Sequence, residues 1–205
     1  MTGSTREQLK QATHLRVLDT ARRLFQDRGL AATTVRDIAQ ASGVSVGTVM
    51  TVGDKNALLV QAFDTMVTAV HAQRAGYAPP LGGDSDTCVG RLDVLVQPFV
   101  SLFTENPELS RTYASILVSG THSSVLFTDL AAALINEFTT AITTHGCTSQ
   151  TDAPTKAQAL YAAYVGTLFT WSARDSLDPS GLTTRLHTVF ATICGCKEPH
   201  DAPHP

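Results

Sequence analysis

The strongest constraint on the fold comes from residues 35 to 54, "VRDIAQASGVSVGTVMTVGD". Two short helices can cross at a fixed angle only if a small residue lies where they touch and the turn between them tolerates an unusual backbone conformation. Ala39 and Gly43 meet these two requirements. Four aliphatic residues are spaced to fill the wedge between these helices and the preceding one: Ile38, Val44, Val49 and Val52. Because these features occur together and in register, we predict a helix-turn-helix.

Capping residues mark the ends of the two short helices. Thr34 can cap the second helix of the chain, and Asp37, three residues later, completes a capping box that satisfies free backbone N–H groups. Ser45 can cap a third helix over about residues 46 to 52. The Gly-Asp pair at 53 and 54 then interrupts the chain before a long fourth helix.

The helices on either side of the motif each carry one apolar face. The first runs from about residue 7 to 28, with Gly29 as its left-handed stop. Its apolar face consists of Leu15, Leu18, Ala21, Leu24 and Phe25. The corresponding stripe of the fourth helix consists of Leu58, Leu59, Ala62, Phe63, Met66 and Val70.

The remainder of the chain also has helical spacing. The stretch "GYAPPLGGDSD" at 76–86 predicts a loop, because it has two prolines, three glycines and no apolar period. Five further helical segments follow, at about 87–104, 107–119, 123–145, 154–175 and 179–195. No run of residues has the alternation of a strand. We therefore expect an all-α protein with a three-helix domain at 1–53, a helical bundle at 54–195 and a flexible tail at 196–205.

Charge is distributed unevenly along the chain. Residues 1 to 60 contain eight Lys and Arg against five Asp and Glu, whereas the remainder contains seven against thirteen. A basic N-terminal end hints at a polyanionic partner, and a solvated basic helix face explains the same counts. The chain opens without the apolar stretch of a secretory signal and has no membrane-spanning run. We expect a cytoplasmic protein with four free cysteines and no membrane contact.

In a helix-turn-helix of this kind, the third helix enters the major groove of DNA by its N-terminal residues. The residues expected to face double-stranded DNA on this helix are Ser45, Val46, Thr48, Met50 and Thr51. Val46, Thr48 and Met50 suit apolar contact with thymine methyl groups. Thr33 and Thr34 can donate hydrogen bonds to phosphates.

The chain resembles the tetracycline-repressor (TetR) family of bacterial transcription regulators. The resemblance lies in "VLDTARRLFQDRGLAATTVRDIAQASGVSVGTV" and "DKNALL", within about residues 16 to 63. It implies a homodimer with an N-terminal domain that binds operator DNA and a C-terminal bundle that binds a small-molecule effector and dimerises. Effector binding would tilt the fourth helix and release DNA. The resemblance also assigns Arg36 and Lys55 to DNA contacts, Arg36 to a phosphate or a guanine edge and Lys55 to the backbone.

One stretch departs from the family pattern. After "GT" the family usually continues with a leucine, aromatic residues, a histidine and a phenylalanine, but "VMTVG" follows here. The second hypothesis is therefore a small-molecule-binding helical dimer that has lost sequence-specific DNA reading. If the DNA-reading domain works, its specificity shifts towards methyl contacts, Arg36 and DNA shape.

The C-terminal part provides candidates for an effector pocket and for a dimer interface. The pocket candidates are Phe99, Phe103, Tyr113, Leu117, His122, Phe138, Tyr164 and Trp171, although aromatics at helical spacing are also the normal content of a core. A pocket of this composition would take a neutral, largely apolar effector. The segment "ALYAAYVGTLFTWSARDSL" is similar to the dimer-forming helix of the family. The interface candidates are Val165, Phe169, Leu186, Val189, Phe190 and Ile193.

No catalytic motif occurs in the sequence. It lacks a Gly-rich phosphate loop, a nucleophile elbow and a His-Glu metal helix, so we expect no enzyme and no cofactor. The end of the chain holds Cys194, Cys196, His200 and His204. Thiol and imidazole groups at this spacing could bind zinc or copper or sense redox state, but a Cys-x-Cys pair is a weak signal, and no metal is expected there.

Overall fold

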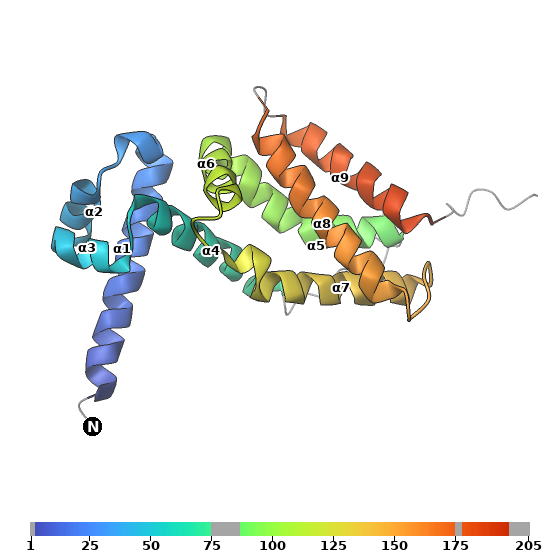
Figure 1. Cartoon of the computed structure of the whole chain (residues 1–205), viewed down its shortest axis with the longest axis horizontal. Helices are drawn as coiled ribbons and strands as arrows, with labels where there is room; N and C mark the ends of the chain where they lie inside the picture. The colour runs from blue at the N-terminus through green and yellow to red at the C-terminus, as the bar shows by residue number, and fades with distance from the viewer. Residues whose placement is uncertain (1–2, 75–86, 175–177, 197–205) are drawn as a thin grey trace, which may run out of the picture. The chain divides into compact units, whose positions relative to one another are not determined.

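A computed structural model describes residues 3–74, 87–174 and 178–196, and all regular structure within these ranges is helical (Figure 1). In chain order the helices are α1 (Gly3–Ala32), α2 (Val35–Ser42), α3 (Val46–Val52), α4 (Lys55–Arg74), α5 (Cys88–Glu105), α6 (Pro107–Val118), the 3-10 turn η2 (Val125–Phe127), α7 (Asp129–His145), α8 (Ala153–Ser172) and α9 (Pro179–Cys194). The all-α prediction is confirmed. The expected loop at 76–86 and the tail from 197 lie outside the described residues. No described helix combines the length and apolarity needed to cross a bilayer.

The described residues form two compact units. The first contains residues 3–69 and 106–125, and the second contains 70–105 and 126–196. Helix α4 contributes residues to both units, and α6 belongs to the first unit although α5 and α7 belong to the second. The chain therefore passes from one unit to the other within α4 and again at the two ends of the α6 segment.

Local chemistry explains the short helices of the first unit. The Thr34 side chain accepts a hydrogen bond from the backbone N–H of Asp37, and the Asp37 carboxylate accepts one from the backbone N–H of Thr34, which is the predicted capping box. Gly43 ends α2 with φ 68° and ψ 32°, a left-handed conformation that favours glycine. Ser45 caps α3 by accepting from the N–H of Thr48 at 3.0 Å. These three predictions are confirmed.

The core of the first unit is the predicted wedge. Ile38 and Val49 are fully buried, together with Val17, Ala21, Phe25 and Leu58. The sequence places Leu15 on the inner face of α1, but 49% of it is exposed. It lines a cavity of about 320 Å³ between α1 and α4, together with Leu18, Ala62, Met66 and Ala69. On α4, Val67 is buried in place of the expected Met66.

The second unit is a bundle in which α8 packs on α7 and α9, and α5 packs on α7 and α9. The aromatic rings of Phe138 and Phe190 meet edge to face in its core, with centroids 6.1 Å apart. The Tyr161 hydroxyl donates to the carbonyl of Leu126, and burial raises the pKa of Tyr161 to about 12. This bond fixes η2 against α8.

The predicted helix over 123–145 is wrong in its first turns. Only Val125 to Phe127 form a 3-10 turn there, and α7 begins at Asp129. The reason is a competing partner, because the Ser124 hydroxyl and the Val125 N–H both donate to the carboxylate of Asp64. Because these groups are bound to Asp64, the backbone here does not continue the hydrogen-bond pattern of an α-helix.

Candidate DNA interface and effector-binding unit

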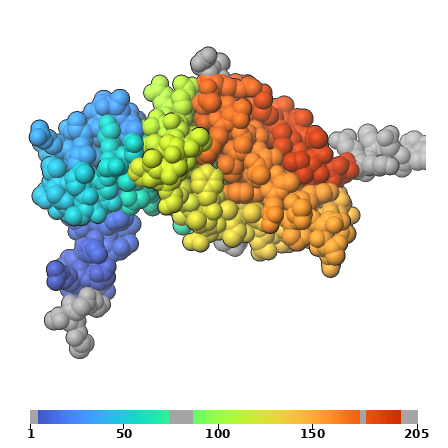
Figure 2. Space-filling model, viewed as in Figure 1, coloured from blue at the N-terminus to red at the C-terminus, as the bar shows by residue number. Residues whose placement is uncertain are grey.

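Helix α3 presents one face to solvent and buries the other. Val46 and Met50 are 43% and 51% exposed, whereas Val49 is fully buried against α1 and α2. Ser45 and Thr51 are exposed and Thr48 is half-buried. The space-filling view shows α2 and α3 forming an outer surface of the first unit (Figure 2). Two exposed apolar side chains on a short surface helix fit contact with the apolar edge of a partner such as thymine.

The polar groups of α3 are held in place by local hydrogen bonds. The hydroxyls of Ser45 and Thr48 lie 2.9 Å apart, and the Thr51 hydroxyl donates to the carbonyl of Thr48 at 2.7 Å. These bonds fix the side-chain directions on the exposed face before any partner arrives. Fixed directions reduce the conformational entropy that binding costs.

Helix α2 places Arg36 on the surface, and the two threonines that precede the helix have different surroundings. Arg36 is exposed, as a base or phosphate contact requires. Thr34 is also exposed, and the hydrogen bonds from its hydroxyl and its backbone hold the pKa of Asp37 below its usual value. Thr33 is fully buried, and its hydroxyl points to the carbonyls of Gly29 at 2.8 Å and Leu24 at 3.2 Å. Thr33 therefore has a structural role, which corrects its expected contact with phosphate.

Lys55 lies at the start of α4 but its side chain turns back to α1. Its ammonium group donates to the carbonyl of Leu30 at 2.9 Å, and the residue is half-buried. Gly29, with φ 78° and ψ 162°, breaks the helical path of α1 just before Leu30. Lys55 thus adds a charged donor to a carbonyl that also accepts from the backbone N–H of Thr33 at 3.3 Å. The side chain therefore connects the end of α1 to α4, and its contact with the DNA backbone stays a prediction.

A half-buried carboxylate holds α4 to α6 within the first unit. Asp64 accepts hydrogen bonds from the Tyr113 hydroxyl at 2.9 Å, the Ser124 hydroxyl at 2.7 Å and the Val125 N–H at 3.1 Å. Burial raises the pKa of Asp64, and the three hydrogen bonds oppose that rise. The Phe63 ring stacks on the Tyr113 ring with centroids 4.6 Å apart. The position of α4 therefore depends on α6 and on the residues that follow it.

A weaker contact links the residues that follow α6 to the beginning of α4. The His122 imidazole lies 3.6 Å from the Asp54 carboxylate, which also caps α4 by accepting from the N–H of Ala57 at 2.8 Å.

Sequence reasoning missed Asp64 as a functional residue. The available signal was an acidic residue inside the apolar stripe of α4, directly after Phe63.

The structure divides the expected effector-pocket residues between the two units. Tyr113, Leu117 and His122 belong to the first unit, where Tyr113 and His122 contact α4 as described above. The other five lie in the second unit and are all buried: Phe99, Phe103, Phe138, Tyr164 and Trp171. The Trp171 indole N–H donates to the carbonyl of Asp178 at 2.9 Å, so it links the end of α8 to the residue that caps α9.

The described cavities of the first unit do not involve these residues. One, of about 390 Å³, lies between the end of α1 and the start of α6, and the other is the α1–α4 cavity that Leu15 lines. In the second unit, the Nδ1 atom of His71 is buried and has no hydrogen-bond partner among the described residues, and the His71 ring lies over Phe99 with centroids 6.4 Å apart. His71 is a polar group that sequence reasoning did not select.

The expected dimer-interface residues also divide into two sets. Leu186 and Phe190 are buried in the core of the second unit, which corrects their assignment, because a side chain packed inside one protomer cannot meet a second. Val165, Phe169, Val189 and Ile193 are partly exposed on α8 and α9. The Phe169 ring also meets the Phe127 ring edge to face, with centroids 6.3 Å apart.

Residues 17–51 match the model of bacterial regulatory proteins of the tetR family, and this range covers the second half of α1, all of α2 and nearly all of α3. The N-terminal segment of the chain therefore matches the pattern of this family. The stretch that departs from the family pattern, "VMTVG" at 49–53, begins inside this match and runs two residues past it, and it forms the C-terminal part of α3 with its capping Gly53.

Two solved structures of TetR-family regulators share this fold over most of the chain. Thermus thermophilus FadR, a TetR-family transcriptional repressor solved in complex with lauroyl-CoA, matches with a TM-score of 0.65 and 19% sequence identity, over 94% of this chain and 98% of that one. A TetR transcriptional regulator from Rhodococcus sp. RHA1 matches with a TM-score of 0.59 and 19% identity, over 89% and 95% of the two chains. A search of curated proteins found no significant match.

Proposed function

We propose that the protein is a ligand-responsive transcriptional regulator, a homodimer that binds operator DNA through α3 and is released by a small, largely apolar effector. The observation that carries this proposal is the two-sided character of α3 in a TetR-family domain, with Val49 buried and Val46 and Met50 exposed. A dimer would place its two α3 helices in successive major grooves, roughly 34 to 36 Å apart. The operator would then be a near-palindrome.

DNA contacts are assigned to the exposed residues of α2 and α3. Arg36 provides a guanidinium group for a guanine edge or a phosphate, and Val46 and Met50 provide apolar contact with thymine methyl groups. Phosphate contacts add affinity that falls as salt concentration rises. The remaining assigned contacts are Thr34, Ser45, Thr48, Thr51 and Lys55.

The effector site is assigned to the second unit. Its buried aromatic side chains favour an apolar ligand, and the unpaired Nδ1 of His71 beside Phe99 provides one polar group for orientation. The fold neighbour FadR was solved with lauroyl-CoA, which supports an effector with an apolar chain. A role of the five aromatics in packing alone is the alternative for each of them.

The contacts of α4 support a mechanism for release. Effector binding in the second unit would act on residues 70–74 of α4 directly and on Asp64 through the α6 segment, whose ends continue into α5 and α7. Because Lys55 connects α4 to the end of α1, a shift of α4 would move the DNA-binding helices. Dimerisation is assigned to Val165, Phe169, Val189 and Ile193 on α8 and α9.

Fluorescence anisotropy with the DNA upstream of the protein's own gene tests this proposal. At physiological salt concentration we expect the protein to form a complex with this DNA, and we expect that an excess of an unrelated duplex does not displace the DNA from it. Met50→Ala should weaken this complex without lowering the thermal midpoint, because Met50 is exposed. Val118→Ala is the matched control, since Val118 is an exposed aliphatic residue on α6. Equal, weak binding to all duplexes would instead support a small-molecule-binding dimer without sequence reading, which the missing aromatics of α3 favour.

A further inference from the structure

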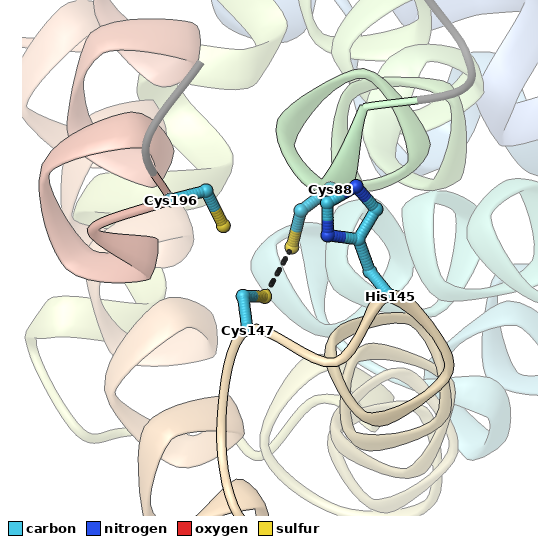
Figure 3. Close-up of side chains that lie close together, drawn as sticks. All are labelled: Cys88, His145, Cys147 and Cys196. Carbon is cyan, nitrogen blue, oxygen red and sulfur yellow. Dashed lines mark hydrogen bonds between the residues drawn. The ribbon is translucent and has the colours of Figure 1, made fainter. Parts of the chain in front are cut away.

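Four potential metal ligands converge at one end of the second unit. They are Cys88 at the first residue of α5, His145 at the last residue of α7, Cys147 just after it, and Cys196 just after α9 (Figure 3). One ligand atom from each side chain lies within 4.8 Å of the other three. Cys88 is buried, Cys147 and Cys196 are half-buried, and His145 is exposed. All four cysteines of the chain are free thiols.

The spacing of these atoms fits one small ion at their centre. Zinc bonds of about 2.3 Å to sulfur and about 2.0 Å to nitrogen place tetrahedral ligand atoms roughly 3.4 to 3.8 Å apart. The Sγ atoms of Cys88 and Cys147 are already 3.1 Å apart, and the largest separation in the set is 4.8 Å. Movements of the four ligand atoms by less than about 1 Å would therefore bring them to the corners of a tetrahedron around the ion.

The donor types select the metal. Three sulfurs and one imidazole are soft or borderline ligands, and the set has no carboxylate, so Mg²⁺ and Ca²⁺ are disfavoured. A Cys₃His set with four protein ligands is a closed tetrahedral zinc site, which leaves no position for a substrate.

We propose that Cys88, His145, Cys147 and Cys196 form a zinc site that clamps the start of α5 to the ends of α7 and α9. Binding converts the three thiols to thiolates and releases their protons to solvent, while the imidazole binds in its neutral form. The assembled centre carries a net charge of −1. The ammonium group of Lys156 lies on this side of the unit, donating to the carbonyl of Cys194 at 3.2 Å, and offsets part of that charge.

Cys194 takes a different part in this arrangement. Its Sγ lies 3.6 Å from the Sγ of Cys88 but is not a member of the four-atom set. Cys194 therefore lies beside the site and supplies none of its four ligand atoms. The sequence pattern pairs Cys194 and Cys196 with the histidines of the tail. The structure instead brings Cys196 to ligands that are distant in the sequence.

The test is cobalt binding by the full-length protein, reduced and then freed of reductant and metal under anaerobic conditions. We expect one equivalent of Co²⁺ to produce thiolate-to-cobalt charge-transfer absorption and the intense visible bands of a tetrahedral centre, and Zn²⁺ to displace it. Cys147→Ser and Cys196→Ser should lose or strongly weaken these bands. Cys194→Ser is the matched control and should keep both the bands and the stoichiometry.

Three outcomes would overturn the proposal: no absorption bands in the reduced wild-type protein, a weak octahedral spectrum, or equal bands in Cys147→Ser and Cys196→Ser. Loss of two thiols on exposure to air, in protein that takes up no metal when reduced, would assign Cys88 and Cys147 to a redox pair instead. Circular dichroism of each variant establishes that it is folded, and Cys196 follows the last helix, so its replacement leaves the helical core unchanged. Because DNA binding is measured separately, failure of the metal site and failure of the proposed regulator are distinguishable.

Discussion

The junction between α3 and α4 allows a sharp test of how the DNA-binding helices are held. Gly53 caps α3 with φ 163° and ψ 169°, an extended backbone that any residue can adopt. A Cβ at this position would lie 2.7 Å from the Cβ of Ala57. Since carbon atoms pack best at about 3.5 to 4.0 Å, Gly53→Ala requires a displacement of about 1 Å between two atoms fixed to the backbone. We expect a loss of about 1 to 3 kcal/mol in the free energy of unfolding, the usual cost of overpacking.

A double-mutant cycle isolates this clash. Ala57→Gly alone should cost about 1 kcal/mol, because glycine is a poor helix former. In the Ala57→Gly background, Gly53→Ala should cost little, since only the flexible end of Gln61, at 3.2 Å, remains close. Gly43→Ala is the control, because Gly43 has φ 68° and an added Cβ there would meet no atom within 4 Å. Its cost of roughly 1 to 2 kcal/mol is therefore conformational and should not depend on Ala57.

Urea unfolding followed by far-ultraviolet circular dichroism measures the six proteins of the two cycles: wild type, the three single variants, and the two double variants that contain Ala57→Gly. The expected result is a coupling free energy of about 1 kcal/mol or more between positions 53 and 57, and none between 43 and 57. If Gly53→Ala costs the same with and without the Ala57 methyl group, the close approach of α3 to α4 described above does not exist in the folded protein.

Three further predictions follow from the same unit. Arg36→Ala should weaken operator binding by roughly 1 to 3 kcal/mol if the guanidinium reads a base; unchanged affinity in a titration with operator DNA would remove Arg36 from the interface. Lys55→Met should lower the free energy of unfolding by about 1 to 2 kcal/mol, because the carbonyl of Leu30 loses a charged donor, and unaltered urea stability would show that this bond contributes nothing. Burial raises the folded-state pKa of Asp64, so the stabilisation from its protonation is full below the unfolded-state pKa and is lost as pH rises through the folded-state pKa. The stability of wild-type protein relative to Asp64→Asn should therefore fall as pH rises through this window, and a difference that is constant with pH contradicts the assignment.

The sequence predicts the helix-turn-helix well because its determinants are local. The Thr34 capping box, the Ser45 cap and the left-handed Gly43 each depend on residues three or four positions apart. Apolar periodicity then identifies Ile38 and Val49 as core residues. All of these features appear in the structure as expected, since short-range hydrogen bonds and helical spacing leave few alternatives.

The candidate site could be predicted only in part because its contacts connect distant segments. Periodicity shows that Tyr113 faces a core, but not that its hydroxyl meets Asp64, 49 residues earlier. The same limit applies to Phe190, which packs on Phe138 inside one protomer although its helix face also suited an interface. The sequence does not distinguish a buried threonine such as Thr33 from an exposed one. Only the fold shows which carbonyls accept a hydrogen bond from its hydroxyl.

The cysteines illustrate the same limit. Cys88 and Cys147 are 59 residues apart, and no spacing rule relates them to each other or to Cys196. Only the ends of α5, α7 and α9 bring their sulfurs together. Ligand sets assembled from separate helix ends are visible in three dimensions alone.

The central claim is that two copies of α3 read one operator, and footprinting on the upstream DNA tests it most directly. We predict protection of a near-palindromic site whose half-sites are one helical turn apart, roughly 34 to 36 Å, with protection that shrinks or disappears in Met50→Ala and persists in Val118→Ala. Uniform, weak protection along the whole fragment, or identical footprints for Met50→Ala and wild-type protein, would contradict the assignment of α3 as the DNA-reading helix.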